Sequence, residues 1–161
     1  MALDFFSEFN GIVQALQGTE IRYAVMGGVA VAIYGGVRST KDIDFMVHPE
    51  DGDAFGRLLK SLGYRSNRGS IRFKDSGLTL RRYLKFERGE THFYMVDVLS
   101  ADTAKNQKML ARADAQDWAG GGVKVLKKKD LIELKLARSS LADLSDIDAL
   151  KGRRDKKTYQ G

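Results

Sequence analysis

The stretch YAVMGGVAVAIYGGVRSTKDIDFMV, residues 23–47, decides the fold of this chain. Residues 21–26, which are mostly apolar, predict a short strand that leads directly into Gly27-Gly28. Residues 29–34 are apolar on every side, which is typical of a short buried helix. Residues 42–47 predict a second strand. The order is therefore strand, glycine pair, helix and strand, with two aspartates at the start of the second strand.

The rest of the chain predicts an α+β (α/β) domain in which a mixed β-sheet is flanked by helices. Further helices are predicted over residues 4–17, 50–62, 129–137 and 141–150, and further strands over residues 70–74, 78–86, 92–99 and 123–126. Residues 103–118 predict a weaker helical or irregular segment. The last two helices would form a C-terminal helical pair. We expect a single domain over residues 1–150 and a basic tail over residues 151–161.

The composition excludes several classes of protein. The chain has 161 residues, 43% of them hydrophobic, and this is enough for one domain with its own core. It contains no cysteine, so disulfide scaffolds, thiolate metal sites and thiol nucleophiles are excluded. No apolar run approaches the ~20 residues that a membrane span needs, and the N-terminus does not resemble a signal peptide. We therefore expect a cytoplasmic protein without a membrane partner.

The net charge of +6 favours a phosphate-bearing partner only weakly. Residues 151–161 hold five basic side chains and one acidic side chain, so the tail accounts for most of the excess. Such a tail is more often a solvated chain end than a recognition element.

Asp42 and Asp44 occupy alternate positions of a predicted strand, so they project from the same face while Ile43 turns to the other. Two carboxylates in one small volume repel each other, and a divalent cation relieves this repulsion. Because the chain has no cysteine and only two histidines, a hard ion such as Mg²⁺ is expected. The alternative is that Asp42 caps a turn and Asp44 faces solvent.

Asp97 lies within the apolar run Phe93–Leu99, where a carboxylate is costly to bury without a partner. If this strand lies beside residues 42–47, three acids converge in the arrangement that holds two metal ions for phosphoryl or nucleotidyl transfer. The alternative is an aspartate bonded to a neighbouring arginine. Gly27-Gly28 would let backbone N–H groups approach a triphosphate at the start of a helix, or would form a tight turn without a ligand.

Three segments together resemble the DNA polymerase β-like nucleotidyltransferase superfamily. They are Tyr23–Gly28, Arg38–Asp44 and Val96–Val98. Within the superfamily, the sequence is most similar to the bacterial AbiEii-type group, whose members include toxins of toxin–antitoxin pairs. The segments over residues 129–137 and 143–147 are similar to the C-terminal helices of that group. The resemblance covers about residues 20–150 and implies the polymerase β-like nucleotidyltransferase fold.

The resemblance also implies roles for individual residues. Asp42 and Asp44 would ligate Mg²⁺, and the site would hold two Mg²⁺ ions. Asp97 would complete the metal site and help to deprotonate the acceptor hydroxyl. The residues that would bind the nucleotide are Gly27, Gly28, Arg38, Thr40 and Lys135. Asp143 and Asp146 are carried over as further candidates, with helix capping as the alternative. Many superfamily members have Gly-Ser where this chain has Gly27-Gly28, so one hydroxyl hydrogen bond to phosphate is absent here.

The expected activity is transfer of a nucleoside monophosphate from an NTP to an acceptor hydroxyl. RNA or tRNA is the first acceptor considered, ahead of a protein side chain and a small molecule such as an aminoglycoside. The RNA prediction depends on cationic and aromatic side chains that alternate over residues 64–88: Tyr64, Arg65, Arg68, Arg72, Phe73, Lys74, Arg81, Arg82, Tyr83, Lys85, Phe86 and Arg88. Two alternatives are a catalytically inactive module that binds RNA or protein and a metal-dependent phosphohydrolase. A toxin role would add a cognate antitoxin as a partner.

Overall fold

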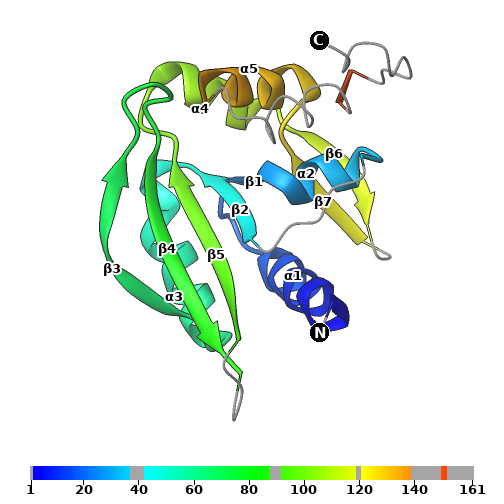
Figure 1. Cartoon of the computed structure of the whole chain (residues 1–161), viewed down its shortest axis with the longest axis vertical. Helices are drawn as coiled ribbons and strands as arrows, with labels where there is room; N and C mark the ends of the chain where they lie inside the picture. Colours follow the sequence, from blue (N-terminus) through cyan, green and yellow to red (C-terminus); the bar gives the residue numbers. More distant parts are fainter. Residues whose placement is uncertain (1, 37–41, 88–91, 119–120, 139–149, 152–161) are drawn as a thin grey trace.

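The structure is a computed structural model that describes residues 2–36, 42–87, 92–118, 121–138 and 150–151. Within these ranges the helices are α1 (Ala2–Leu16), α2 (Gly27–Ile33), η1 (a 3-10 turn, Pro49–Asp51), α3 (Gly52–Ser61), α4 (Ala104–Ala111) and α5 (Lys128–Arg138). The strands are β1 (Tyr23–Met26), β2 (Asp42–Val47), β3 (Arg65–Arg72), β4 (Thr79–Phe86), β5 (Phe93–Ser100), β6 (Asp114–Trp118) and β7 (Gly121–Val125) (Figure 1).

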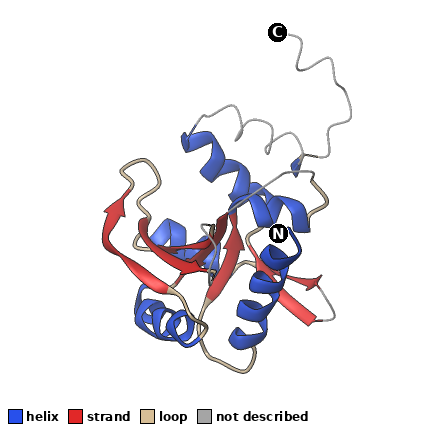
Figure 2. Cartoon of the chain, turned by 60° about the horizontal axis from the view of Figure 1, so that its bottom comes forward, coloured by secondary structure: helices blue, strands red, loops and turns tan. Residues whose placement is uncertain are grey.

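All seven strands form one mixed sheet in the order β3-β4-β5-β2-β1-β7-β6. The pairs β2 with β5 and β1 with β7 are parallel, and the other neighbours are antiparallel. Figure 2 shows the strands as a curved layer with helices around it. The predicted mixed sheet flanked by helices is confirmed.

Part of the core lies between the centre of the sheet and two helices. Phe45 of β2 packs against Phe9 of α1 and Phe55 of α3, with ring centroids 6.2 and 5.1 Å apart, and all three side chains are fully buried. Burial of a side chain of this size stabilises a fold by about 1.5–3 kcal/mol. Because side chains alternate along a strand, the β2 residues on either side of Phe45 turn to the opposite face of the sheet.

Two predicted segments differ from the structure. Residues 103–118 form α4 and then β6, which pairs with β7, so the prediction of a helical or irregular segment was wrong for its second half. The DAQDW sequence of β6 has little intrinsic strand preference, and its pairing with β7 decides its conformation. The strand predicted over residues 70–74 lies at residues 65–72. It is a polar edge strand, with a register shift between Asn67 and Ile71.

The C-terminal helical pair is only partly described. Its first helix is α5, whereas residues 141–149 of the second helix and residues 152–161 of the basic tail lie outside the described residues. In the described part of the chain, the helices are all too short or too polar to cross a membrane.

Candidate active site

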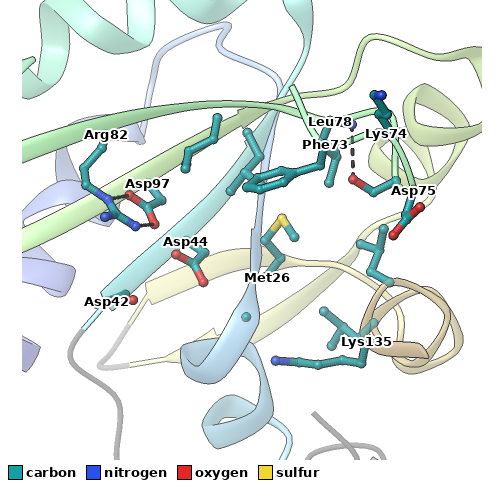
Figure 3. Close-up of a pocket in the computed structure, with 16 residues that line it drawn as sticks. Met26, Asp42, Asp44, Phe73, Lys74, Asp75, Leu78, Arg82, Asp97 and Lys135 are labelled. Atoms are coloured by element: carbon teal, nitrogen blue, oxygen red, sulfur yellow. Dashed lines mark hydrogen bonds and ion pairs between the residues drawn. The ribbon is translucent and has the colours of Figure 1, made fainter. Parts of the chain in front are cut away.

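Three aspartates lie on one face of the central strands. In the parallel pairing of β2 with β5, Asp44 lies directly opposite Asp97, and Asp42 lies opposite Met95. Ile43, between the two β2 aspartates, is completely buried on the other face. The expected neighbourhood of the two strands is confirmed, and all three aspartates line the same pocket (Figure 3). We refer to Asp42, Asp44 and Asp97 as the acid row.

The pocket has a volume of about 750 Å³, within the range of sites for small molecules and cofactors. It is built from β1, α2, β2, β4, β5, the loop between β3 and β4, and α5. Its charged side chains are the acid row, Lys74, Asp75, Arg82 and Lys135, and its apolar side chains are Met26, Phe73, Leu78, Leu80, Leu99, Leu131 and Leu134. A cluster of carboxylates therefore lies beside three cations and a broad apolar wall.

Gly27 lies against the acid row at the start of α2. Its neighbour Met26 is paired with Asp44 across β1 and β2, and Gly27 itself has a φ of +69°. A Cβ atom at this position would lie 2.1 Å from Oδ2 of Asp44, so a side chain would displace the carboxylate. Gly28 is buried in the first turn of the helix. The structure thus requires glycine at position 27 for two independent reasons, backbone conformation and space.

Asp97 is paired with an arginine of the adjacent strand. Arg82 of β4 lies opposite Asp97 in the antiparallel register, and its Nε and Nη2 atoms donate hydrogen bonds of 2.8 and 3.0 Å to Oδ1 and Oδ2. This bidentate arrangement is the strong form of an arginine–carboxylate contact. It is the alternative that the sequence left open for Asp97, an aspartate bonded to a neighbouring arginine.

Arg82 is absent from the predicted nucleotide and metal site, because the sequence does not give the register of its strand. In a hairpin, residues that face each other are equally far from the turn. Counting outward from the turn-forming residues 87–90 would place position 82 opposite position 95, whereas the observed register pairs Phe86 with Phe93 and Arg82 with Asp97. In the sequence, Arg82 belongs only to the basic side chains of residues 64–88.

The carboxylates of the acid row act together on Arg82. The pKa of Arg82 is raised above its usual value, first by the hydrogen bonds with Asp97 and then by attraction to Asp97, Asp42 and Asp44, while partial burial acts in the opposite direction. Arg82 is therefore attracted mainly by Asp97 and to a smaller extent by the other two carboxylates of the row.

Lys135 lies in the pocket, as the resemblance implied. It belongs to α5, its exposed fraction is only 6%, and its neighbours Leu131 and Leu134 line the same pocket. Figure 3 shows its side chain extending from α5 toward the start of α2. A cation therefore stands on the side of the pocket where Gly27 lies, apart from Arg82.

The loop between β3 and β4 forms a further wall that the predicted site residues do not include. The Phe73 amide donates a 2.9 Å hydrogen bond to the Leu78 carbonyl, and Nδ2 of the buried Asn106 donates a 2.8 Å hydrogen bond to the carbonyl of Ser76. Phe73 lines the pocket from this loop. The turn chemistry of residues 75–77 is visible in the sequence, but its anchoring by α4 depends on the tertiary structure.

Four of the candidate residues lie outside the described residues, namely Arg38, Thr40, Asp143 and Asp146. Gly28 is described but is not part of the pocket lining.

Two members of the acid row, Asp42 and Asp44, fit the divalent ion that the resemblance implies. Their donors are carboxylate oxygens, which hard ions prefer, while Arg82 is the cation that Asp97 binds in this structure. Across the described ranges, no three acidic or histidine side chains form a complete set of ligands for one ion. Asp42 and Asp44 fit as the first two ligands, while both oxygens of Asp97 are engaged by Arg82.

The cationic and aromatic side chains of residues 64–88 do not share one surface. Tyr64 is buried and donates a 2.8 Å hydrogen bond from its hydroxyl to Glu8, and Lys85 pairs with the same glutamate at 2.9 Å. Tyr83 is also buried. The exposed aromatic members of this set are Phe73 and Phe86, and the exposed cations include Arg65 and Arg72. The exposed surface that these side chains could offer to RNA is therefore smaller than the sequence predicts.

Solved nucleotidyltransferase structures share this fold. A Thermotoga maritima protein described as a nucleotidyltransferase has a TM-score of 0.64 and 15% identity, over 93% of this chain and 94% of its own. The antibiotic-resistance factor ANT(2'')-Ia has a TM-score of 0.63 and 19% identity, over 94% and 83% of the two chains. The lincosamide antibiotic adenylyltransferase LnuA, solved with lincomycin bound, has a TM-score of 0.61 and 14% identity, over 90% and 95%. At these identities the likeness concerns the fold, and the predicted nucleotidyltransferase fold is confirmed.

A search of curated proteins finds no match to the sequence. The family model described as "Uncharacterised nucleotidyltransferase" matches residues 2–156. Because this match spans nearly the whole sequence, the chain belongs to that family of nucleotidyltransferases.

Proposed function

We propose that the chain transfers a nucleoside monophosphate from an NTP to an acceptor hydroxyl, with pyrophosphate as the leaving group, and that it does so with Mg²⁺. The observation that carries this proposal is the shared pocket of the acid row, Gly27 and Lys135. One wall offers carboxylates to a metal, and another offers a helix start and a cation to phosphate groups.

Each residue has a specific task in this reaction. Asp42 and Asp44 hold the metal, and Asp97 accepts the proton of the acceptor hydroxyl on a carboxylate oxygen. The acceptor oxygen forms a bond to the α-phosphorus, and the bond from that phosphorus to the bridging oxygen of the β-phosphate breaks, with its electron pair leaving on pyrophosphate. Lys135 and the backbone around Gly27 stabilise the charge on the leaving phosphates. Mg²⁺, in two ions by the resemblance, supplies charge neutralisation and polarises the reacting oxygens when bound.

RNA remains our first candidate for the acceptor. Phe73 stands at the pocket with 41% of its surface exposed, and Arg65 and Arg72 of the edge strand are exposed. Exposed aromatic rings and cations are what a single-stranded nucleic acid end requires. The antibiotic adenylyltransferase LnuA makes a small-molecule hydroxyl the principal alternative.

The test is an incubation of the purified chain with each of the four NTPs labelled at the α-phosphate, with Mg²⁺ and total cellular RNA. Aminoglycosides, lincosamides and protein extract serve as parallel acceptors. We expect labelled RNA and released pyrophosphate from wild type and neither from Asp44→Asn. Label in a small molecule would move the acceptor to that class. Release of free phosphate without a labelled acceptor would indicate a phosphohydrolase, and no consumption of any NTP would favour an inactive binding module.

The narrower AbiEii-type membership adds a toxin role with a cognate antitoxin to this proposal. If it is correct, induced expression of the wild-type chain arrests bacterial growth, whereas Asp44→Asn at equal abundance does not. Equal growth of both strains would contradict the toxin role without affecting the nucleotidyl transfer.

A further inference from the structure

Arg82 competes with the proposed task of Asp97. Its two hydrogen bonds of 2.8 and 3.0 Å occupy one acceptor position on each carboxylate oxygen, in the geometry that a planar guanidinium matches. Proton acceptance and metal ligation use the same oxygens, and a bound guanidinium makes them less basic. The proposed reaction is therefore favoured when this contact opens.

We propose that Arg82 is a positioning residue that acts as an internal counter-ion. It holds Asp97 while the site lacks a divalent ion and releases Asp97 when Asp42 and Asp44 hold one. This inference rests on the proposed function, because it concerns the same carboxylates and the same metal.

The burial of the two partners determines which one moves. The Asp97 side chain is 9% exposed, whereas the Arg82 side chain is 39% exposed. A buried carboxylate without a cation is strongly destabilised, so Asp97 must exchange one positive partner for another. Arg82 can rotate toward solvent, because its other neighbour in the sheet is the exposed Asn67 of the edge strand β3.

The position of the pair in the sheet supplies the driving force for this exchange. Arg82, Asp97 and Asp44 occupy one row across β4, β5 and β2. Because Arg82 shares this row with Asp44 and this pocket with Asp42, their negative charges attract the guanidinium as well as that of Asp97 does. An ion held by Asp42 and Asp44 cancels that attraction and repels the guanidinium, while it attracts the Asp97 carboxylate.

The test measures Mn²⁺ binding by the full chain without nucleotide, from the electron paramagnetic resonance signal of free Mn²⁺. The variants are Arg82→Gln, which removes the charge, and Arg82→Lys, which keeps the charge but not the bidentate geometry. Arg81→Gln is the matched control, since Arg81 is the adjacent residue of β4, is exposed and projects from the opposite face. We expect about tenfold tighter binding in Arg82→Gln, about threefold in Arg82→Lys and less than about twofold change in Arg81→Gln.

A double-mutant cycle with Asp97→Asn separates release of Asp97 from the simple loss of a positive charge. In the Arg82→Gln background Asp97 is a metal ligand, so we expect Asp97→Asn to cancel most of the gain. With Arg82 in place, we expect Asp97→Asn to cost less Mn²⁺ affinity than it does in the Arg82→Gln background, because wild type must break the Arg82 contact before Asp97 can reach the ion.

The possible outcomes distinguish this inference from the proposed function. Mn²⁺ binding by wild type with unchanged or weaker binding in both Arg82 variants overturns the role of Arg82 alone, because such a result would make Arg82 a support for the metal site. Failure of wild type and variants to bind Mn²⁺ overturns the metal-dependent function itself. If Arg82→Gln does not fold, Arg82→Lys decides the question, since lysine keeps a cation beside the buried Asp97.

Discussion

Two arginine–aspartate pairs in this molecule have nearly the same geometry and different surroundings. Arg82 binds Asp97 with bonds of 2.8 and 3.0 Å, and Arg112 binds Asp130 with bonds of 2.8 and 2.6 Å. The arginine side chains are 39% and 38% exposed, and both aspartates are buried. The contact itself therefore does not distinguish the two regions.

The neighbours of each pair make the difference. Asp130 stands in the first turn of α5, where a carboxylate is favourable, and Arg112 follows the end of α4. This pair fastens two helices, and the other acidic neighbour, Glu133, is itself paired with Lys105. Arg82 and Asp97 stand instead beside two further carboxylates in a pocket. The same ion pair is an anchor in one place and a charge that can be exchanged in the other.

The largest expected effect comes from removing the aspartate charge in each pair. Asp97→Asn should lower the rate of nucleotidyl transfer by about 10³-fold, because the proton acceptor is lost. Asp130→Asn should leave transfer at permissive temperature within about threefold and should lower the melting temperature, because a buried charged hydrogen-bond network is lost. Transfer assays and thermal denaturation of both variants check this contrast. Equal loss of activity in the two variants would contradict this contrast, because the two ion pairs would then not differ in their importance for catalysis.

The second prediction disturbs the acid row from the backbone. Gly27→Ala should lower transfer by about 10²-fold, because the added methyl group pushes the Asp44 carboxylate out of place and misplaced catalytic groups cost about this much. Gly35→Ala is the matched control near the other end of α2, with a φ of +92° and no atom within 4 Å of the added Cβ. Both variants carry about 1 kcal/mol of backbone strain, so this part of the stability loss is shared, and any further loss in Gly27→Ala comes from the displaced carboxylate. Similar activities in the two variants would exclude a specific contact between position 27 and Asp44.

A third, smaller effect concerns Lys135, the buried lysine of the pocket. Lys135→Met should lower kcat/KM for the NTP by about tenfold, because a charge near the leaving phosphates is lost while the side chain keeps its length. Lys129→Met changes an exposed lysine of the same helix and should have no effect on kcat/KM. Steady-state kinetics with varied NTP measure both. An unchanged kcat/KM in Lys135→Met would remove this lysine from the nucleotide site.

The sequence contained most of what defines the acid row and little of what surrounds it. Alternation along a strand placed Asp42 and Asp44 together, and the cost of burying Asp97 required a partner for it, because both arguments are local. The choice between a metal and an arginine as that partner depends on the register of β4 and β5. The anchoring of the Phe73 loop by Asn106 and the strand β6 depend on contacts between segments far apart in the chain. Local chemistry thus predicted the candidate ligands, and tertiary pairing determined their neighbours.

The smallest expected effect separates the two pairs by their response to Mg²⁺. If Arg82 competes with the metal for Asp97, the tenfold tighter binding in Arg82→Gln corresponds to about 1.4 kcal/mol of extra stabilisation at saturating ion. For a chain of this length that is an additional rise in melting temperature of about 4 °C relative to wild type. Arg112→Gln lowers the melting temperature without Mg²⁺ but should show the same Mg²⁺-induced rise as wild type, since Asp130 and Glu133, the acids that act on Arg112 among the described residues, lie outside the acid row. Differential scanning calorimetry with and without Mg²⁺ measures both shifts. If the Mg²⁺-induced rise in melting temperature were also larger in Arg112→Gln than in wild type, breaking either ion pair would produce this effect. The result would then not support competition between Arg82 and the metal for Asp97.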